Sequence, residues 1–209
     1  MAFALRPTDA LLVIDMQLDF LPGGALAVAG GDQIIPGINA LAARFDHVIL
    51  TQDWHPEGHI SFASTHNLRP FVDAIDAPYG KQTLWPDHCL QDSPGAALHS
   101  DLNIPHTELI LRKGFRRSID SYSAFTENDG TTPTGLAGYL RERNLQRLFF
   151  TGLAYDFCVG FSALAAAELG FESIVVDDLT RAVGLPGTVD TTNKAFAEAK
   201  VQLTQSSSF

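Results

Sequence analysis

The sequence predicts an α/β fold, a three-layer sandwich in which helices flank a six-stranded, mainly parallel, Rossmann-like sheet. Short apolar runs recur along the chain without the alternation of a sheet that faces water. Segments with helical spacing of apolar residues separate these runs. This alternation of strands and helices favours parallel strands joined by right-handed crossovers, with helices on both faces of the sheet.

Each predicted strand is a brief run of Leu, Ile, Val and Phe. Runs that are apolar throughout are typical of strands buried on both faces of a sheet. We expect five such strands and a sixth near the end of the chain, at residues 11–14, 48–50, 109–111, 148–150, 174–176 and 201–203.

Four segments between the strands have helical spacing, at residues 33–44, 134–144, 158–169 and 189–199. Pro36 falls in the first helical turn, where a missing N–H is tolerated. Thr134 is a candidate N-cap and Gly170 a candidate C-cap. Residues 52–106 have no clear period, which in a compact domain usually marks a functional segment. We expect the tail, residues 205–209, to be frayed.

The composition fits one globular domain that spans residues 1–209. The 209 residues include 14 Lys and Arg against 24 Asp and Glu, a formal net charge of −10, and 45% are hydrophobic. A chain of this length buries a full core without disulfides or a structural metal. We therefore interpret Cys89 and Cys158 as free thiols in a reducing cytoplasm.

The acidic balance argues against nucleic acid and membranes as partners, because phosphate binding needs clustered cations. The nearest approach to such a cluster is Arg112, Lys113, Arg116 and Arg117. No apolar segment approaches the roughly 20 residues that span a bilayer. The N-terminal stretch MAFALRPTD is too short for a secretory signal.

Reactive side chains follow four of the predicted strands. Asp15 follows the first, Asp53 and His55 follow the second, Lys113 the third and Cys158 the fourth. Ligands of open α/β sheets bind beyond the carboxyl ends of the strands. We therefore expect these five side chains at one edge of the sheet.

Three of these residues form a candidate set for nucleophilic catalysis. Cys158 starts a predicted helix, whose N-terminal N–H groups favour an anion, and Lys113 would favour the thiolate further. Asp15, partly desolvated behind a buried strand, could accept the thiol proton. Singly, each has a simpler interpretation: a buried cysteine, a surface ammonium and a turn cap. Together at the strand ends they indicate an activated nucleophile.

Asp53 and His55 form a candidate metal site. Alternate residues on an extended segment point the same way, and carboxylate and imidazole suit Zn²⁺, Fe²⁺ or Mn²⁺. Further histidines follow at His59, His66 and His88. We interpret the others as solvated or hydrogen-bonded loop residues, namely His47, His99 and His106.

Five ordered blocks of sequence carry a resemblance to a known family. They are ALLVIDMQLDFLPGGAL, TQDWHPEGHISFAS, LWPDHC, KGFRRSIDSYSAF, and GLAYDFCVGFSALAAAELGF followed by DLTRAV. With these blocks the chain resembles the nicotinamidase/pyrazinamidase branch of the isochorismatase-like cysteine hydrolases, from Asp9 to about Leu203. The resemblance implies a six-stranded parallel sheet.

The resemblance also implies residue roles. The family's Asp–Lys–Cys triad falls on Asp15, Lys113 and Cys158, and its metal ligands fall on Asp53, His55 and His88, with waters completing the shell. His59 and Ser61 lie where the family varies, so they are not assigned as ligands, and a fourth protein ligand stays open. Phe20 and Trp85 match positions that sandwich a pyridine ring, and Tyr122 is a candidate for the pocket wall. A cis peptide is implied at Leu153–Ala154, with the backbone N–H groups of Ala154 and Cys158 as the oxyanion site.

The implied activity is hydrolysis of nicotinamide to nicotinate and ammonia, and of pyrazinamide to pyrazinoate, through a cysteine thioester. One divalent ion, Zn²⁺ before Fe²⁺ or Mn²⁺, would hold the pyridine nitrogen. The partners implied are this small substrate, with no nucleic acid and no membrane, and the chain would be a monomer or a small homo-oligomer.

Three alternatives stay open. The first is another hydrolase of the same superfamily, such as an isochorismatase, a carbamoyl-amide hydrolase or a ureidoacrylate hydrolase. Relatives that act on other substrates generally lack the metal triad of Asp53, His55 and His88. The second is a non-catalytic ligand-binding module on this fold. The third, a dinucleotide-binding oxidoreductase, is disfavoured because Asp15-Met16-Gln17 replaces a G-x-G-x-x-G motif after the first strand.

Overall fold

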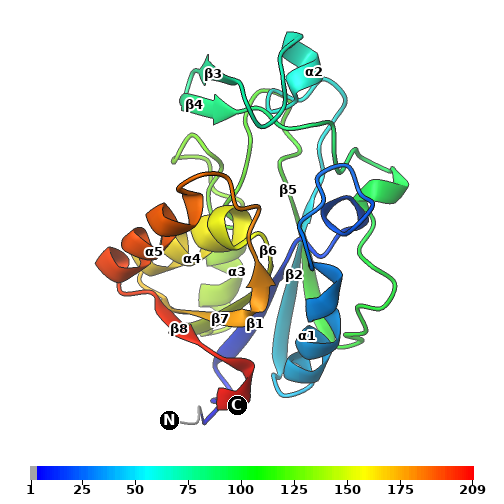
Figure 1. Cartoon of the computed structure of the whole chain (residues 1–209). Helices are drawn as coiled ribbons and strands as arrows, with labels where there is room; N and C mark the ends of the chain where they lie inside the picture. Colours follow the sequence, from blue (N-terminus) through cyan, green and yellow to red (C-terminus); the bar gives the residue numbers. More distant parts are fainter. Residues whose placement is uncertain (1–3) are drawn as a thin grey trace.

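A six-stranded parallel sheet forms the centre of the computed structural model, which describes residues 4–209 (Figure 1). Residues 1–3, where we expected no secretory signal, lie outside the described residues. The strand order is β5-β2-β1-β6-β7-β8, and every neighbouring pair is parallel. The predicted α/β sandwich is therefore confirmed. The strands are β1 (Asp9–Ile14), β2 (His47–Asp53), β5 (Thr107–Lys113), β6 (Arg147–Leu153), β7 (Glu172–Arg181) and β8 (Gln202–Thr204).

Helices cover both faces of this sheet. Helix α1 (Ile35–Ala42) lies on one face, and α3 (Leu136–Glu142), α4 (Gly160–Glu168) and α5 (Thr188–Ala199) lie on the other (Figure 1). Strand β1 supplies both cores, because its side chains alternate between the faces. Leu11 and Val13 pack into the core under α1, whereas Leu12 and Ile14 pack under the other three helices.

Helix ends differ in detail from the predictions. Pro36 lies in the first turn of α1, as predicted. The N-cap prediction for Thr134 is wrong: α3 starts after Gly135, whose φ of 99° suits glycine, and the Thr134 hydroxyl accepts the Leu136 N–H at 3.2 Å. Gly170, with φ of 88°, follows α4 and ends it as predicted.

Two strand predictions need correction. We expected burial on both faces for every strand, but β5 lies at the edge of the sheet and exposes alternate side chains, Ile110 by 49%. An edge strand has neighbours on one side only, so one of its faces is less covered. The sixth strand exists, but β8 starts at Gln202 and not at Val201.

The segment expected to be irregular contains ordered elements. They are the short helix α2 (Ala63–His66) and an antiparallel hairpin of β3 (Ala74–Ala77) and β4 (Gly80–Thr83). Figure 1 shows α2 and the hairpin above the carboxyl ends of the main strands. The hairpin strands read AIDA and GKQT, so Ile75 is their one large apolar side chain and the sequence carries no apolar alternation there.

The C-terminal tail is ordered, so the expectation of fraying is wrong. Ser206 donates its backbone N–H to Asp178 at 2.7 Å, and its hydroxyl donates to the same carboxylate. The Phe209 ring packs against Phe149 at a centroid distance of 5.3 Å and against Phe45 at 6.0 Å. Among residues 4–209, none of the helices has the length and apolar character needed to cross a membrane.

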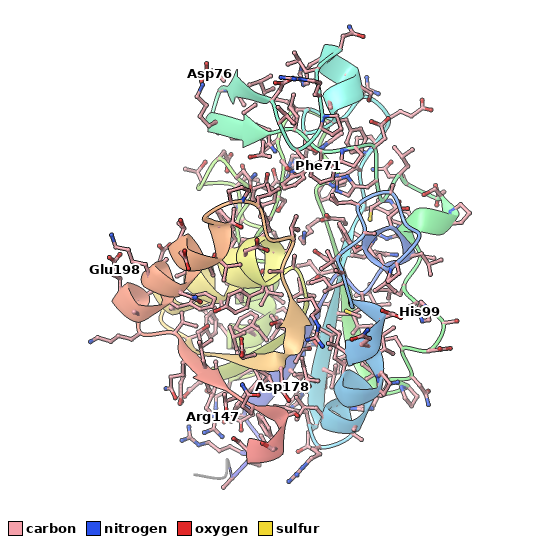
Figure 2. The ribbon with its side chains drawn as sticks, viewed as in Figure 1. Phe71, Asp76, His99, Arg147, Asp178 and Glu198 are labelled. Carbon is pink, nitrogen blue, oxygen red and sulfur yellow. The ribbon has the colours of Figure 1, made fainter. Side chains whose placement is uncertain are left out.

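A buried ion pair joins β1 and β6 at the amino ends of the strands. Arg147 donates from Nε to Asp9 Oδ1 at 2.8 Å and from Nη2 to Asp9 Oδ2 at 2.5 Å. Both side chains are nearly inaccessible to solvent. Figure 2 shows Arg147 at the end of the molecule opposite Phe71. This bidentate pair fixes two neighbouring strands far from the reactive side chains.

We expect Asp9→Ala to lower the free energy of unfolding by about 3–5 kcal/mol, because it leaves the Arg147 guanidinium buried without its carboxylate. Urea denaturation would measure this change. The matched control is Glu172→Ala, which removes the exposed ion pair with Arg6 at 3.5 Å and should cost less than about 1 kcal/mol. Equal effects of the two variants would contradict the prediction.

Candidate active site

The carboxyl ends of four strands bring four polar side chains together in the interior. Asp53 and Lys113 are the last residues of β2 and β5 and are partners in the register of the sheet. Asp15 directly follows β1, with a φ of 47°, and Cys158 follows β6. Asp15, Lys113 and Asp53 are all less than 5% exposed. The structure therefore brings together the residues that the strand-end argument selected.

The ammonium of Lys113 lies at the centre of this cluster. Its Nζ donates to Asp53 Oδ1 at 2.5 Å, to the Ser121 carbonyl at 3.0 Å and to Cys158 Sγ at 3.3 Å. Asp15 Oδ2 also lies 2.8 Å from Nζ. Burial alone would lower the pKa of Lys113, but Asp15 and Asp53 raise it well above the usual value. Lys113 is therefore charged.

Asp15 is held through both of its carboxylate oxygens. Its Oδ1 accepts the Thr51 hydroxyl at 2.6 Å. Its Oδ2 lies 2.8 Å from Lys113 Nζ and forms an ion pair with the ammonium. The three hydrogens of Lys113 are therefore shared among four acceptors, on Asp15, Asp53, Ser121 and Cys158. A carboxylate oxygen of Asp15 lies within 4.8 Å of Cys158 Sγ, which makes Asp15 a candidate acceptor for the thiol proton.

Burial changes the proton affinities of both reacting groups. Burial raises the pKa of Cys158 well above its usual value, and this outweighs the opposite effect of Lys113. Lys113 lowers the pKa of the thiol in the expected direction, but burial outweighs it, so the resting sulfur is a thiol and not a thiolate. Burial also raises the pKa of Asp15, more than Lys113 lowers it. A protonated thiol consequently faces a carboxylate that has become a better base.

The local backbone differs from the predicted helix start. Cys158 lies in η4 (Tyr155–Val159), a turn with five-residue spacing in which the Val159 N–H donates to the Ala154 carbonyl at 3.1 Å. Phe157 inside this turn is non-helical, and α4 begins only at Gly160. The Leu153–Ala154 peptide is cis, as the resemblance implies.

A buried carboxylate anchors this turn to the loop after β7. Asp156 accepts the backbone N–H groups of Val183 at 2.8 Å and Gly184 at 2.9 Å, and the hydroxyl of Thr188 at 2.5 Å. Bonds to a charged acceptor are stronger than neutral ones. The turn that carries Cys158 and the loop that carries Val183 are thereby held together.

Asp53, His55 and His88 present donor atoms suited to a divalent metal. Their donor atoms lie within 4.8 Å of one another, and all three residues are buried. Asp53 Oδ2 lies 3.5 Å from His55 Nε2 and 3.9 Å from His88 Nε2, while Oδ1 of the same carboxylate faces Lys113.

The backbone sets the tautomers of both imidazoles. His55 Nδ1 lies 2.8 Å from the Gly114 carbonyl, and His88 Nδ1 lies 2.8 Å from the Pro86 carbonyl. A carbonyl only accepts, so each Nδ1 carries the hydrogen and each Nε2 lone pair faces Asp53. A Cβ on Gly114 would lie 2.4 Å from His55 Cε1, so this approach needs glycine. The donor set fits Zn²⁺, Fe²⁺ or Mn²⁺.

The charges of Asp53 and His88 suit ligation, whereas a proton on His55 would compete with a metal ion. Lys113 and His55 lower the pKa of Asp53 more than burial raises it, so the carboxylate is ionised. Burial lowers the pKa of His55, but the Asp53 carboxylate raises it more, to a value above the usual one. Burial, reinforced by His55, lowers the pKa of His88 to about 4, which keeps this imidazole neutral.

The remaining histidines make other contacts. The His59 ring stacks on His55 at a centroid distance of 4.2 Å, and its Nδ1 lies 2.7 Å from the Ser61 hydroxyl. Its Nε2 lies 3.3 Å from the Ile119 carbonyl, so both nitrogens of His59 have partners. The donor atoms of His55, His59 and Asp120 form a second group within 4.8 Å. The other four histidines make hydrogen bonds in loops or near the surface, namely His47, His66, His99 and His106.

A cavity opens in front of Cys158 and the three candidate metal ligands. Its wall includes all the aromatic and backbone positions that the resemblance selects, namely Phe20, Trp85, Tyr122 and Ala154. The Trp85 ring lies edge-on to Phe157 at a centroid distance of 4.9 Å. Asp15 and Lys113 lie behind Cys158 and outside the cavity wall. A small aromatic molecule in this cavity would contact Cys158 directly.

Sequence reasoning missed part of the wall. The residues missed are Leu26, Val28, Asp120, Phe157 and Val183. Four of them, Leu26, Asp120, Phe157 and Val183, lie inside sequence blocks that carry the resemblance, which was a usable signal. Val28 lies outside these blocks, and the fold brings it to the cavity.

The second cysteine belongs to the core. Cys89 is fully buried, and burial raises the pKa of its thiol well above the usual value. Its backbone N–H donates to Asp19 Oδ2 at 2.7 Å. Cys89 directly follows a candidate metal ligand, but its side chain is not part of the cavity wall.

Comparison with known proteins finds relatives that are similar in sequence and in structure. The isochorismatase domain matches residues 9–206. A nicotinamidase from Acinetobacter baylyi is 52% identical over 180 residues, which cover 86% of this chain and 84% of the relative. The structure of a nicotinamidase and pyrazinamidase from Acinetobacter baumanii superimposes with a TM-score of 0.95 at 47% identity, covering 98% of this chain and 99% of that one. A pyrazinamidase of Pyrococcus horikoshii, solved in complex with zinc, has a TM-score of 0.78 at 32% identity, covering 95% and 99%.

We expect His59 and His88 to take up protons near pH 4 in the metal-free protein, against about 6.5 for an unperturbed imidazole. NMR of the imidazole carbon-bound protons would measure this, with His59→Gln and His88→Gln assigning the signals. Because the unfolded chain binds these protons at higher pH, both groups lower the free energy of unfolding as pH falls from about 6.5 to 4. Titration of both rings near pH 6.5 would contradict the burial argument.

Proposed function

The chain belongs to the isochorismatase domain family, and we propose that it hydrolyses nicotinamide to nicotinate and ammonia through Cys158. One observation carries the proposal: a buried thiol opens onto an aromatic cavity and has a carboxylate oxygen of Asp15 behind it, within 4.8 Å of the sulfur. The reaction is the one named for the Acinetobacter baylyi relative. The same proposal extends to pyrazinamide, after the pyrazinamidase activities named for the two structural relatives.

The first half of the reaction forms a thioester. Asp15 takes the Cys158 proton as the sulfur attacks the amide carbon, and the carbonyl oxygen becomes an oxyanion. The N–H groups of Ala154 and Cys158 are the proposed donors to this oxyanion. Asp15 then gives the proton to the leaving nitrogen, the C–N bond breaks, and ammonia leaves.

The second half of the reaction releases the acid. Asp15, again a carboxylate, removes a proton from a water molecule that attacks the thioester carbon. The C–S bond breaks and Cys158 recovers its proton, giving nicotinate and the resting thiol. Lys113 stays charged throughout and stabilises negative charge on the sulfur, 3.3 Å from its Nζ.

A divalent metal would be held by Asp53, His55 and His88. When bound, it would supply a Lewis-acidic position for the pyridine nitrogen and so orient the carboxamide toward Cys158. The chain supports this role with ligand chemistry, because the carboxylate is ionised and both imidazoles direct Nε2 toward it. This ligand set favours a ring substrate with a coordinating nitrogen over the carbamoyl amides of other superfamily members.

The purified wild-type chain should release ammonia from nicotinamide, and Cys158→Ala should lower kcat by at least about 10³-fold, because it removes the nucleophile. Cys89→Ala is the matched control: it also deletes a buried thiol, but one outside the cavity wall, and kcat should change by less than about threefold. An enzyme-coupled ammonia assay measures both variants.

A substrate panel tests the proposal against its alternatives. The panel holds nicotinamide, pyrazinamide, a carbamoyl amide, a ureidoacrylate and isochorismate, with the product acids followed by chromatography. Turnover of another member of the panel well above nicotinamide would contradict the proposed substrate. Retention of more than a few per cent of kcat in pure Cys158→Ala would contradict the covalent route.

Removing the metal should abolish most of the activity. We expect chelation to lower turnover of nicotinamide at least tenfold and added Zn²⁺ to restore it. His88→Ala should weaken Zn²⁺ binding by at least about 100-fold, because it removes a ligand and not merely a supporting contact. His99→Ala, a histidine on a loop, is the control and should bind Zn²⁺ like the wild type. Elemental analysis and isothermal calorimetry measure metal content and affinity. Full activity of chelated enzyme with no metal detected would contradict this role.

A further inference from the structure

The hairpin of β3 and β4 sends one side chain into the body of the protein. Gln82 on β4 is 1% exposed, whereas the other residues from 71 to 83 are exposed or half-buried. Figure 1 shows this hairpin at the edge of the molecule, above the carboxyl ends of the main strands. A buried amide on an otherwise exposed hairpin requires hydrogen-bond partners in the interior.

Those partners saturate the Gln82 amide. Its Nε2 lies 2.8 Å from the Thr83 carbonyl, 2.9 Å from Asp120 Oδ2 and 3.0 Å from the Tyr122 hydroxyl, so two hydrogens serve three acceptors. Its Oε1 accepts the Tyr79 hydroxyl at 3.0 Å and Asn128 Nδ2 at 3.4 Å. These contacts hold the amide in one orientation.

The network includes residues that line the substrate pocket. Asp120 and Tyr122 both line the cavity in front of Cys158. A third lining residue, Trp85, donates its indole N–H at 3.0 Å to the same Tyr122 oxygen that Gln82 contacts. Gln82 itself is not part of the cavity wall and makes no hydrogen bond with Cys158, Asp15 or Lys113. Its influence on a ligand must therefore pass through these residues.

We propose that Gln82 is a positioning residue that fixes Tyr122, Asp120 and Trp85 as one wall of the substrate pocket. The inference rests on the proposed amidase function, whose substrate ring this wall would contact. Without the amide donor, the Tyr122 hydroxyl loses one of its two fixed partners and the Asp120 carboxylate loses a buried donor. Ordering these three side chains around a ligand then costs free energy, and this weakens ligand binding. The reacting groups keep their own contacts, so the chemical step is preserved.

Gln82→Leu tests this, because leucine is similar in size and donates no hydrogen bond. We expect the KM for nicotinamide to rise about tenfold while kcat stays within about threefold of the wild type, the signature of lost binding that does not affect the chemical step. Metal content per chain should be unchanged. The control is Gln146→Leu, which removes an exposed amide bonded to Asn144 and should leave KM unchanged. An unchanged KM in Gln82→Leu overturns the proposal, as does an equal rise in Gln146→Leu.

A double-mutant cycle separates positioning from general destabilisation. If Gln82 acts largely through Tyr122, adding Gln82→Leu to Tyr122→Phe should raise KM by no more than about twofold over Tyr122→Phe alone. Multiplication of the two single effects would overturn the proposal. If Gln82→Leu fails to fold, Gln82→Glu is used in the same cycle, because it keeps the acceptor for Tyr79 and removes the donor.

The wild type is assayed first, so that a failure of the proposed function can be distinguished from a failure of the role proposed for Gln82. A wild type inactive on nicotinamide contradicts the proposed function. The substrate selected by the panel then replaces nicotinamide in the same comparison. A wild type active on nicotinamide, with KM unchanged in Gln82→Leu, contradicts the role of Gln82 alone.

Discussion

A single buried ammonium holds the reactive end of this protein together. The Lys113 side chain is inaccessible to solvent, and taking such a charge out of water costs several kcal/mol. The cost is offset only because Asp15, Asp53, Ser121 and Cys158 converge on it from separate segments. The order of strands in the sheet is what makes this convergence possible, since the ends of β1, β2 and β5 are adjacent.

The same ammonium links two halves of the site. Asp53 offers one oxygen to Lys113 and the other to the two imidazoles. Lys113 in turn contacts the sulfur. The candidate metal site and the sulfur of Cys158 thus both contact Lys113. A change in charge at one of them alters the electrostatic energy of the other, because the distances are short and the groups are buried. The three hydrogens of the ammonium are also shared between the acceptors of the two halves, on Asp15, Asp53, Ser121 and Cys158.

The sequence was most informative about features that follow from a general rule of sheet geometry. Parallel strands end at one edge of a sheet, so Asp15, Asp53 and Lys113 could be placed together from their positions alone. It was less informative where several segments determine the outcome. The pKa of Cys158 depends on total burial, which no local pattern reports. The turn η4 replaces a helix start because Phe157 adopts a non-helical conformation. Val28 and Gln82 lie outside the sequence blocks that carry the resemblance, and only the fold brings Val28 to the pocket and Gln82 behind its wall.

Burial of the nucleophile has a consequence for oxidative damage. Peroxides react with thiolates, and exposed cysteines of low pKa are the ones converted to sulfenic acid. Cys158 is 7% exposed and its pKa is raised, so the resting sulfur is a poor target for such oxidants. In the proposed mechanism, Asp15 deprotonates the sulfur as it attacks a bound amide, which would confine nucleophilic sulfur to the moment when the cavity is occupied. An unfolded or partly folded chain lacks this protection, because its thiol titrates near the ordinary value and is open to solvent.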